Sequence, residues 1–291
     1  MHSNYIATGL GSFSKEKFNA LLNVRATALA ALRSALVGLG YTEVSTASLV
    51  NIAGSCENPH ASFRLNYYGR DAHLSQSAQL QLEALVLRLE RSVFTVNNSF
   101  REEHYDDPEA QGRRLSEFTL IEAERPYYYL HPDKALGAIM AIEEDTVKRA
   151  TAAVLDQCTK DLQLLGADLQ YLGSVVERPF ARITYDEVLV LLHREGMLIT
   201  SGDDLGVRAE RKVLAHFGQT PTFVLHHPTR IKFFNMKRMP DGERVYSVDL
   251  LMPRLGETIG GAVREEDGER LKEALLNSAI AEYLREQRGD P

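Results

Sequence analysis

The chain has 291 residues, of which 44 % are apolar and 25 % charged, so it can build a core and is not predicted to be disordered. Its net charge of −7 argues against extensive contact with nucleic-acid backbones, including tRNA. No run approaches the roughly 20 apolar residues of a membrane span, and residues 1–14 lack the features of a signal peptide. Two cysteines without paired spacing exclude a disulfide framework and a zinc site, which indicates a cytoplasmic protein with reduced thiols.

The first half of the chain is predicted to contain both helices and strands. Apolar residues at helical spacing predict helices over Phe18–Leu39 and Ala78–Arg91. β-Branched residues predict a strand over Tyr41–Val50. Alternating apolar and polar residues predict two further strands, Val93–Arg101 and Leu115–Glu124, joined by a long charged loop.

The second half continues in the same manner. The predicted helices are Asp133–Leu165, Thr184–Glu195, Leu205–Phe217 and a closing charged helix over Glu265–Arg288. The predicted strands are Thr222–His226, Ile231–Met236, Arg244–Leu251 and Thr258–Arg264. This order of elements, with no linker or repeat, predicts one α+β domain over residues 1–291, built on a largely antiparallel sheet.

One group of residues has the chemistry of an ATP site. Arg101 ends a predicted strand and Glu103 follows it on the same face, while Arg113 and Arg114 lie on the loop before Phe118. Arginine can bind phosphate with two parallel hydrogen bonds, a carboxylate can accept from an exocyclic amine, and an aromatic ring can stack on a base. The glycine-rich phosphate loops of other nucleotide sites are absent from the sequence.

A second group suits a magnesium ion. Asp249 and Glu257 lie near strand ends, and Mg²⁺ prefers a few carboxylates together with phosphate oxygens of the substrate. Gly260 and Gly261 follow within a predicted strand, where glycine often marks a close approach of backbone or ligand. Taken one at a time, residues of this kind are more often ordinary surface groups.

The order and spacing of these segments resemble one family. FREE followed by RRLSEFTLIEAE resembles the second signature of class II aminoacyl-tRNA synthetases of the aspartyl, asparaginyl and lysyl group. DLLMPRLGETIGGAVREE resembles the asparaginyl form of the strand with the magnesium carboxylates, and LSQSAQLQLEALV and SCENP resemble segments of the amino-acid pocket. The similarity runs from about Phe18 to about Glu266, in the family's order. It implies a class II antiparallel sheet flanked by helices, with ATP and Mg²⁺ as cofactors.

The resemblance also implies the roles of single residues in adenylate formation. Arg101 would hold the α-phosphate and the reacting carboxylate, Glu103 would accept from the adenine amino group, Phe118 would stack on the ring, Arg113 or Arg114 would reach the γ-phosphate, and Asp249 and Glu257 would hold Mg²⁺.

The amino-acid substrate would lie beside these groups. By the same resemblance, Glu57 and Gln79 would bind its α-amino group, and Glu122 and Arg264 would read its side-chain end. Leu82 stands where the aspartyl branch has a lysine for the side-chain carboxylate, although it could equally be a core residue. Loss of that cation, together with Glu122, favours an amide such as asparagine over aspartate.

Three departures from the family pattern shape the functional hypotheses. Only residues 1–17 precede the first predicted helix, too few for an anticodon-binding β-barrel. Ala47 replaces the proline expected at the family's dimer interface. After Arg264 the sequence lacks the third signature and its ATP-binding arginine, which makes the domain C-terminally truncated relative to the family.

We therefore rank first an adenylate-forming ligase that activates asparagine, aspartate or an analogue for a small acceptor such as ammonia, an amine or a carrier. The alternatives are a regulatory or partner subunit that binds an amino acid or nucleotide, and aminoacylation of tRNA with asparagine. A homodimer or a partner chain could complete the site, whereas tRNA and membrane partners are not expected.

Overall fold

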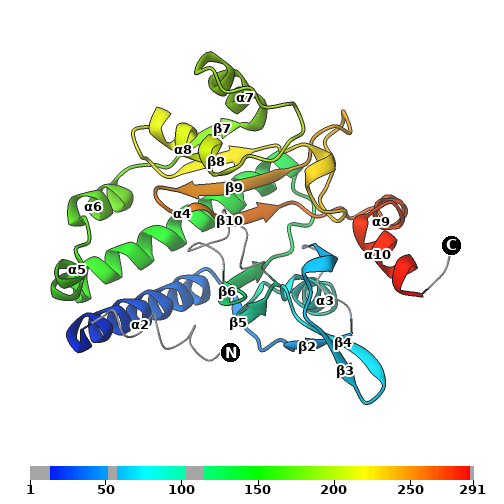
Figure 1. The fold of residues 1–291 in the computed structure, drawn as a ribbon, viewed down its shortest axis with the longest axis horizontal. Coiled ribbons are helices and arrows are strands. Elements are labelled where there is room, and N and C mark those ends of the chain that lie inside the picture. The colour runs from blue at the N-terminus through cyan, green and yellow to red at the C-terminus, as the bar shows by residue number, and fades with distance from the viewer. Residues whose placement is uncertain (1–13, 52–57, 103–114, 289–291) are drawn as a thin grey trace, which may run out of the picture. The chain divides into compact units, whose positions relative to one another are not determined.

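The computed structural model describes residues 14–51, 58–102 and 115–288 (Figure 1). Contacts between Cα atoms divide the chain into two compact units, which are described separately. The first comprises Met1–Leu39 and Ala141–Phe180, and the second comprises Gly40–Met140 and Ala181–Pro291.

The first unit is helical. It contains α2 (Lys15–Gly38), the later part of α4 (Pro132–Gln157), α5 (Thr159–Leu165) and α6 (Leu169–Glu177). Its core gathers Val154, Cys158 and Leu162, with Val24 and Ala28 of α2 packed against them. The prediction of one helix over Asp133–Leu165 was wrong, because the backbone leaves helical geometry at Cys158, which has φ −121° and ψ 22°.

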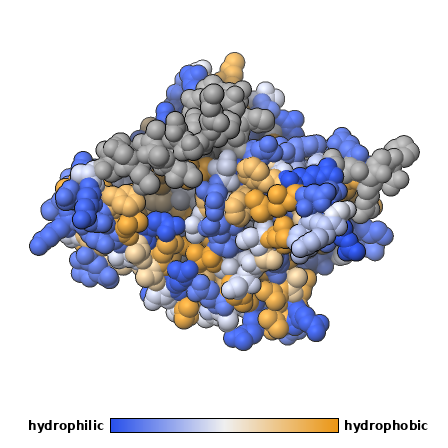
Figure 2. Space-filling model, turned by 60° about the horizontal axis from the view of Figure 1, so that its bottom comes forward, coloured by the Kyte–Doolittle hydropathy of each residue, from blue (hydrophilic) through white to orange (hydrophobic). Residues whose placement is uncertain are grey.

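Helix α2 contradicts one expectation from composition. Within the described residues it is the one helix that could span a membrane by length and composition, with a mean hydropathy of 1.3 over its most apolar window. It nevertheless carries Arg25 and Arg33, and one face contacts α5. On the molecular face shown in Figure 2, hydrophobic residues lie in small groups between hydrophilic ones.

The second unit contains three sheets. The first has the order β1-β5-β6, the second β10-β9-β8-β7 and the third β2-β4-β3. The pairs β1/β5 and β7/β8 are parallel and the other described pairs are antiparallel. The α+β class with a largely antiparallel sheet is therefore confirmed. The strands are β1 (Thr42–Glu43), β2 (Leu49–Val50), β3 (Arg64–Tyr67), β4 (Arg70–Leu74), β5 (Val93–Phe100), β6 (Glu117–Glu124), β7 (Ala181–Thr184), β8 (Thr222–Leu225), β9 (Ser247–Met252) and β10 (Gly256–Ala262).

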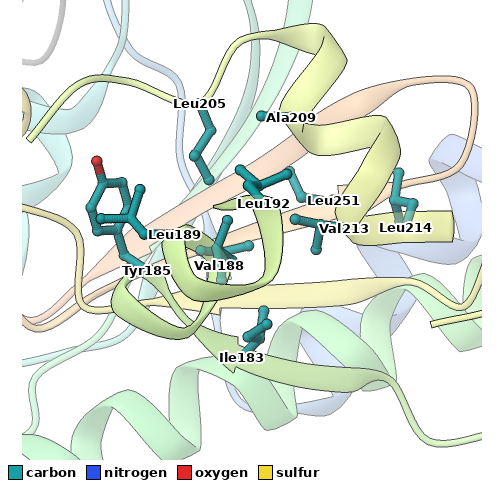
Figure 3. Close-up of a cluster of buried hydrophobic side chains, with 11 residues drawn as sticks. Ile183, Tyr185, Val188, Leu189, Leu192, Leu205, Ala209, Val213, Leu214 and Leu251 are labelled. Atoms are coloured by element: carbon teal, nitrogen blue, oxygen red, sulfur yellow. The ribbon is translucent and has the colours of Figure 1, made fainter. Parts of the chain in front are cut away.

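Two helices cover one face of the second sheet. Figure 3 shows Val188 and Leu192 of α7 (Tyr185–Arg194) packed with Val213 of α8 (Val207–His216) in a cluster of buried side chains. Thr184 and Glu187 form a capping box that begins α7 where β7 ends. Besides the beginning of α4, the other helices described in this unit are α3 (Gln79–Leu89), α9 (Gly268–Leu276), α10 (Ala279–Arg288) and the 3-10 turns η1 (Pro59–Ala61) and η2 (Thr229–Ile231).

Three predicted elements differ in the structure. In Tyr41–Val50 only the ends pair as strands, because the side chain of Gln81 bonds both the N–H and the C=O of Ala47. The predicted strand Ile231–Met236 is a turn and a loop, in which Met236 makes a single bridge. The closing helix is divided into α9 and α10. The β3–β4 hairpin, α6 and β7 were not predicted.

Candidate functional site

Arg101 and Phe118 come together at one end of the β5–β6 pair. Ser99 pairs with Phe118, and the N–H of Arg101 donates to the C=O of Ser116 at 3.0 Å, which continues the ladder beyond β5. The guanidinium carbon of Arg101 lies 5.0 Å from the centroid of the Phe118 ring. This is within the range of a cation–π contact, so the guanidinium is held against an aromatic face.

The alternation of β6 places Phe118, Glu122 and Glu124 on one face of the strand. Glu122 accepts hydrogen bonds from the hydroxyl of Ser77 and from the N–H of Ala78, the latter at 2.8 Å. Ser77 and Ala78 directly precede α3. The carboxylate of Glu122 therefore ties the beginning of that helix to β6.

The carboxylate of Glu122 interacts electrostatically with two arginines, Arg101 and Arg264. Burial raises the pKa of its carboxyl, while its hydrogen bonds and then the charges of Arg101 and Arg264 act in the opposite direction. Burial also raises the pKa of Glu124, against the charge of Arg264 and together with the charge of Glu83. Both arginines thus lie within electrostatic reach of one carboxylate.

Arg264 stands in a cluster of carboxylates. Its Nη2 lies 3.0 Å from Glu124 Oε1 and its Nε lies 3.1 Å from Glu83 Oε1. Glu83 Oε1 also accepts from Gln79 Nε2 at 2.6 Å and from Asn235 Nδ2 at 3.0 Å. One oxygen of Glu83 therefore fixes three neighbours, and two glutamates, Glu83 and Glu124, form ion pairs with one guanidinium.

The β9–β10 hairpin brings Asp249 and Glu257 together. A bulge between Glu257 and Ile259 shifts the register, so that Gly260 pairs with Asp249. A Cβ added at Gly260 would lie 3.3 Å from Glu257 Oε1 and 3.6 Å from Asp249 Oδ1. The absence of a side chain at Gly260 thus leaves space beside both carboxylates.

The other oxygen of Asp249 is held by cationic and polar neighbours. Asp249 Oδ2 lies 2.6 Å from Lys232 Nζ and 3.1 Å from His227 Nε2. Burial lowers the pKa of His227 to about 4, so the ring is neutral near pH 7 and donates from Nε2. Burial lowers the pKa of Lys232, but Asp249 and then Glu257 outweigh it, and the net shift is upward. Lys232 therefore carries a positive charge beside both acids.

The donor set of this hairpin fits Mg²⁺. Burial and then the negative charge of Asp249 raise the pKa of Glu257 to about 7, a repulsion that a divalent cation would relieve. Among the described residues no group of three or more His, Cys, Asp or Glu could hold a metal by itself. Two carboxylates completed by phosphate oxygens match the preference of Mg²⁺.

The hairpin and the arginine cluster belong to the same segment. Alternation along β10 places Gly260 and Ala262 on the face of Asp249, and Arg264 follows two residues later. Arg264 is held by a backbone bridge to Met236. The same face of the chain therefore carries the acids and the arginine.

The predicted site residues have different outcomes. Arg101 lies against Phe118, Gln79 contacts the Arg264 cluster through Glu83, and Asp249 and Glu257 border one space. Glu122 and Arg264 interact electrostatically, whereas the ion pairs of Arg264 are formed with Glu83 and Glu124. The predicted residues that lie outside the described part of the chain are Glu57, Glu103, Arg113 and Arg114.

Sequence reasoning missed several members of the site. Glu83 could have been found, because it lies four residues after Gln79 on the same helical face. Glu124 could also have been found, because it lies two residues after Glu122 on one strand face. Lys232, His227 and Asn235 carry no local signal, since they reach the site only through the folding of a loop.

Comparison with known proteins supports the resemblance seen in the sequence. The model of the family described as tRNA synthetases class II (D, K and N) matches residues 7–289. The chain belongs to this family. The class II synthetases are ligases, for which ATP and Mg²⁺ are the general cofactors.

Several class II relatives are similar over most of the chain. The asparagine–tRNA ligase of Pyrococcus furiosus is 36 % identical over 266 residues, covering 91 % of this chain and 58 % of the relative. The probable cytoplasmic asparagine–tRNA ligase of Schizosaccharomyces pombe is 35 % identical, covering 91 % and 45 %. The crystal structure of asparaginyl-tRNA synthetase from Pyrococcus horikoshii, complexed with asparaginyl-adenylate, aligns with a TM-score of 0.80 and 34 % identity, covering 94 % and 61 %. The chain spans about three fifths of the two archaeal relatives.

Proposed function

We propose that this chain activates L-asparagine by forming asparaginyl-adenylate from ATP. A carboxylate oxygen of the amino acid attacks the α-phosphorus, and pyrophosphate leaves. Arg101 holds the α-phosphate and the attacking carboxylate, and Phe118 stacks on the adenine. Bound Mg²⁺ supplies positive charge at the phosphates, and Asp249 and Glu257 are the residues that would hold it. Catalysis then rests on positioning and on stabilisation of negative charge, without a protein nucleophile.

One observation carries the choice of an amide-bearing amino acid. Glu83 and Glu124 form ion pairs with the single guanidinium of Arg264, and Glu122 lies within its electrostatic reach. Such a site offers many acceptors and repels a second carboxylate, because an uncompensated negative charge in a partly desolvated site is costly. The ammonium and amide groups of asparagine supply the donors that these acceptors require. The side-chain carboxylate of aspartate would add repulsion.

We propose tRNA as the acceptor of the activated amino acid. The P. furiosus and S. pombe relatives are named asparagine–tRNA ligases, which supports this alternative better than the small acceptor ranked first from the sequence. The adenylate in the P. horikoshii complex agrees with the first half of that reaction. We also propose a cytoplasmic location, as in the name of the S. pombe relative.

The family match over residues 7–289 supports our proposal that residues 1–291 act as one catalytic domain. Glu57 and Gln79 are proposed to bind the α-amino group, and Glu103 to accept from the adenine amino group. Arg113 or Arg114 is proposed to reach the γ-phosphate. A second copy or a partner chain remains part of the proposal as a means of completing the site.

The deciding experiment is ATP–pyrophosphate exchange with each of the twenty amino acids. Exchange that depends on asparagine supports the proposal, and exchange with aspartate in preference would overturn the choice of substrate. Product analysis with tRNA, with ammonia and with neither then identifies the acceptor. Asparagine binding without exchange under any condition would favour the regulatory subunit.

A variant of Arg101 tests the mechanism. Arg101→Ala should lower the exchange rate by ~10²-fold or more, because it removes a cation from the transferring phosphoryl group. Arg149→Ala is the matched control, since Arg149 pairs with Asp145 at 2.7 Å on an exposed helix surface. An unchanged rate in Arg101→Ala would remove this residue from the mechanism.

A further inference from the structure

Asn235 holds a buried acceptor in the cluster around Arg264. The residue is 3 % exposed, and its Nδ2 donates to Glu83 Oε1 at 3.0 Å. Its Oδ1 is buried and has no hydrogen-bond partner among the described residues. A buried amide oxygen without a partner costs free energy, so such an atom calls for an explanation.

The orientation of the Asn235 amide is fixed by its neighbour. Turning the amide over would place Oδ1 against Glu83 Oε1, and two acceptors repel each other. Glu83 Oε1 also accepts from Gln79 and Arg264, which holds this oxygen in place. The amide oxygen of Asn235 is therefore kept facing away from Glu83.

The backbone places Asn235 beside the side-chain end of the proposed pocket. The C=O of Asn235 accepts from the N–H of Glu265 at 2.9 Å, and Met236 bridges Arg264. Asn235 and Arg264 thus lie on adjacent, paired segments. The side-chain amide of a bound amino acid offers one acceptor, its carbonyl oxygen, and one donor group, its NH₂. The guanidinium of Arg264 can donate to the first, and an acceptor fixed beside it can receive the second.

We propose that Asn235 Oδ1 accepts a hydrogen bond from the side-chain amide of the bound amino acid, and that Asn235 is a specificity-determining residue for an amide over a carboxylate. This inference rests on the proposed activation of asparagine. Arg264 reads the carbonyl oxygen of the amide, and Asn235 reads its N–H. A side-chain carboxylate has no N–H to donate and meets a second oxygen instead.

Binding of three ligands, measured by calorimetry without ATP, tests the inference on the full chain. L-Asparagine carries both an α-ammonium and an amide, L-aspartate carries only the α-ammonium, and succinamate carries only the amide. The variants are Asn235→Ala and Asn235→Leu, which lack the acceptor and differ in volume. Asn98→Leu is the matched control, because the Asn98 amide donates to Glu117 at 2.8 Å on an exposed strand surface.

Both Asn235 variants should bind L-asparagine and succinamate about tenfold more weakly, whereas any affinity for L-aspartate stays within twofold. The Asn98 control should bind all three ligands as the parent chain does. Equal loss for all three ligands, or loss confined to those with an α-ammonium, would overturn the role in reading the amide. Loss of folded structure in both Asn235 variants, measured by circular dichroism, would assign Asn235 to the scaffold and overturn it as well.

The outcome separates this inference from the proposed function. If the parent chain binds L-asparagine and the Asn235 variants bind it equally well, only the role of Asn235 fails, and its oxygen is satisfied by water or by the protein. If the parent chain binds none of the three ligands, the proposed substrate fails and the role of Asn235 fails with it.

Discussion

Arg264 Nη2 lies 3.0 Å from Glu124 Oε1, and this ion pair connects the segment after β10 to the end of β6. The two residues are 140 positions apart in the sequence. Their side chains are 27 % and 18 % exposed, so the pair is partly shielded from solvent. The contact joins the strand segment that carries the proposed magnesium acids to the strand that carries the proposed ATP residues.

Removal of Arg264 should destabilise the fold and abolish binding of asparagine. Arg264→Ala leaves Glu83 and Glu124 without their shared cation, and we expect a loss of about 1–3 kcal/mol in the free energy of unfolding, measured with urea. Arg64→Ala is the control, because the Arg64–Asp71 pair is largely exposed and should change stability little. Equal losses in the two variants would contradict a special role for the partly shielded pair.

Glu83→Gln tests whether one oxygen positions the pocket. The substitution keeps the shape of the side chain but removes the charge that holds Gln79, Asn235 and Arg264. We expect KM for asparagine in pyrophosphate exchange to rise about tenfold, with a smaller change in kcat, because ground-state binding is lost. Glu195→Gln, at an exposed pair with Lys212, should leave both constants unchanged. An effect on kcat alone would argue against this positioning role.

The positive charge of Lys232 should stabilise the negative charges of Asp249 and Glu257 on the β9–β10 hairpin. In Lys232→Met the carboxylates of Asp249 and Glu257 lose their ammonium neighbour, and we expect a loss of about 3 kcal/mol or more in the free energy of unfolding. The double variant Lys232→Met/Asp249→Asn should recover part of it, which a double-mutant cycle measures. If the loss in the double variant equals the sum of the losses in the two single variants, Lys232 and Asp249 act independently. Lys212→Met provides the exposed control.

The dependence of the free energy of unfolding on pH should contain a contribution from the raised pKa of Glu122. Burial raises its pKa in the folded state above the ordinary value of 4.5, so the folded chain binds this proton more tightly than the unfolded chain. The resulting stability is present below pH 4.5 and is lost as the pH rises through the raised pKa. Glu122→Gln should therefore lose less stability than the parent chain between about pH 4.5 and neutral pH, measured by urea unfolding.

Glu187→Gln is the control, because the pKa of Glu187 is lowered and its contribution to stability depends on pH in the opposite direction. The hydrogen bond from the N–H of Thr184 lowers the pKa of Glu187, so its contribution is present above pH 4.5 and lost as the pH falls through the lowered pKa. Its removal should reduce stability at neutral pH and flatten the acid side of the profile. A stability profile between pH 4.5 and neutral pH that Glu122→Gln leaves unchanged is the result that contradicts the assignment.

Local pattern was sufficient for much of the fold. Helix α3 and the strands β5 and β6 were predicted within two residues of their ends, because their periodicity is strong over their whole length. Pattern failed at Tyr41–Val50 and Ile231–Met236, where β-branched and aromatic residues suggested strands. In the first case a side chain of α3 supplies the hydrogen bonds of Ala47, which no local pattern encodes.

The sequence by itself determined the family, the α+β class and the residue types of the proposed ATP, magnesium and amino-acid groups, because motifs and periodicity are local properties. Only the tertiary structure decided which of these residues meet. It paired Arg264 with Glu83 and Glu124, placed Lys232 and His227 on Asp249, and buried the amide of Asn235 beside Glu83. These contacts join residues far apart in the chain, and their strength comes from shared burial and charge, which no single segment contains.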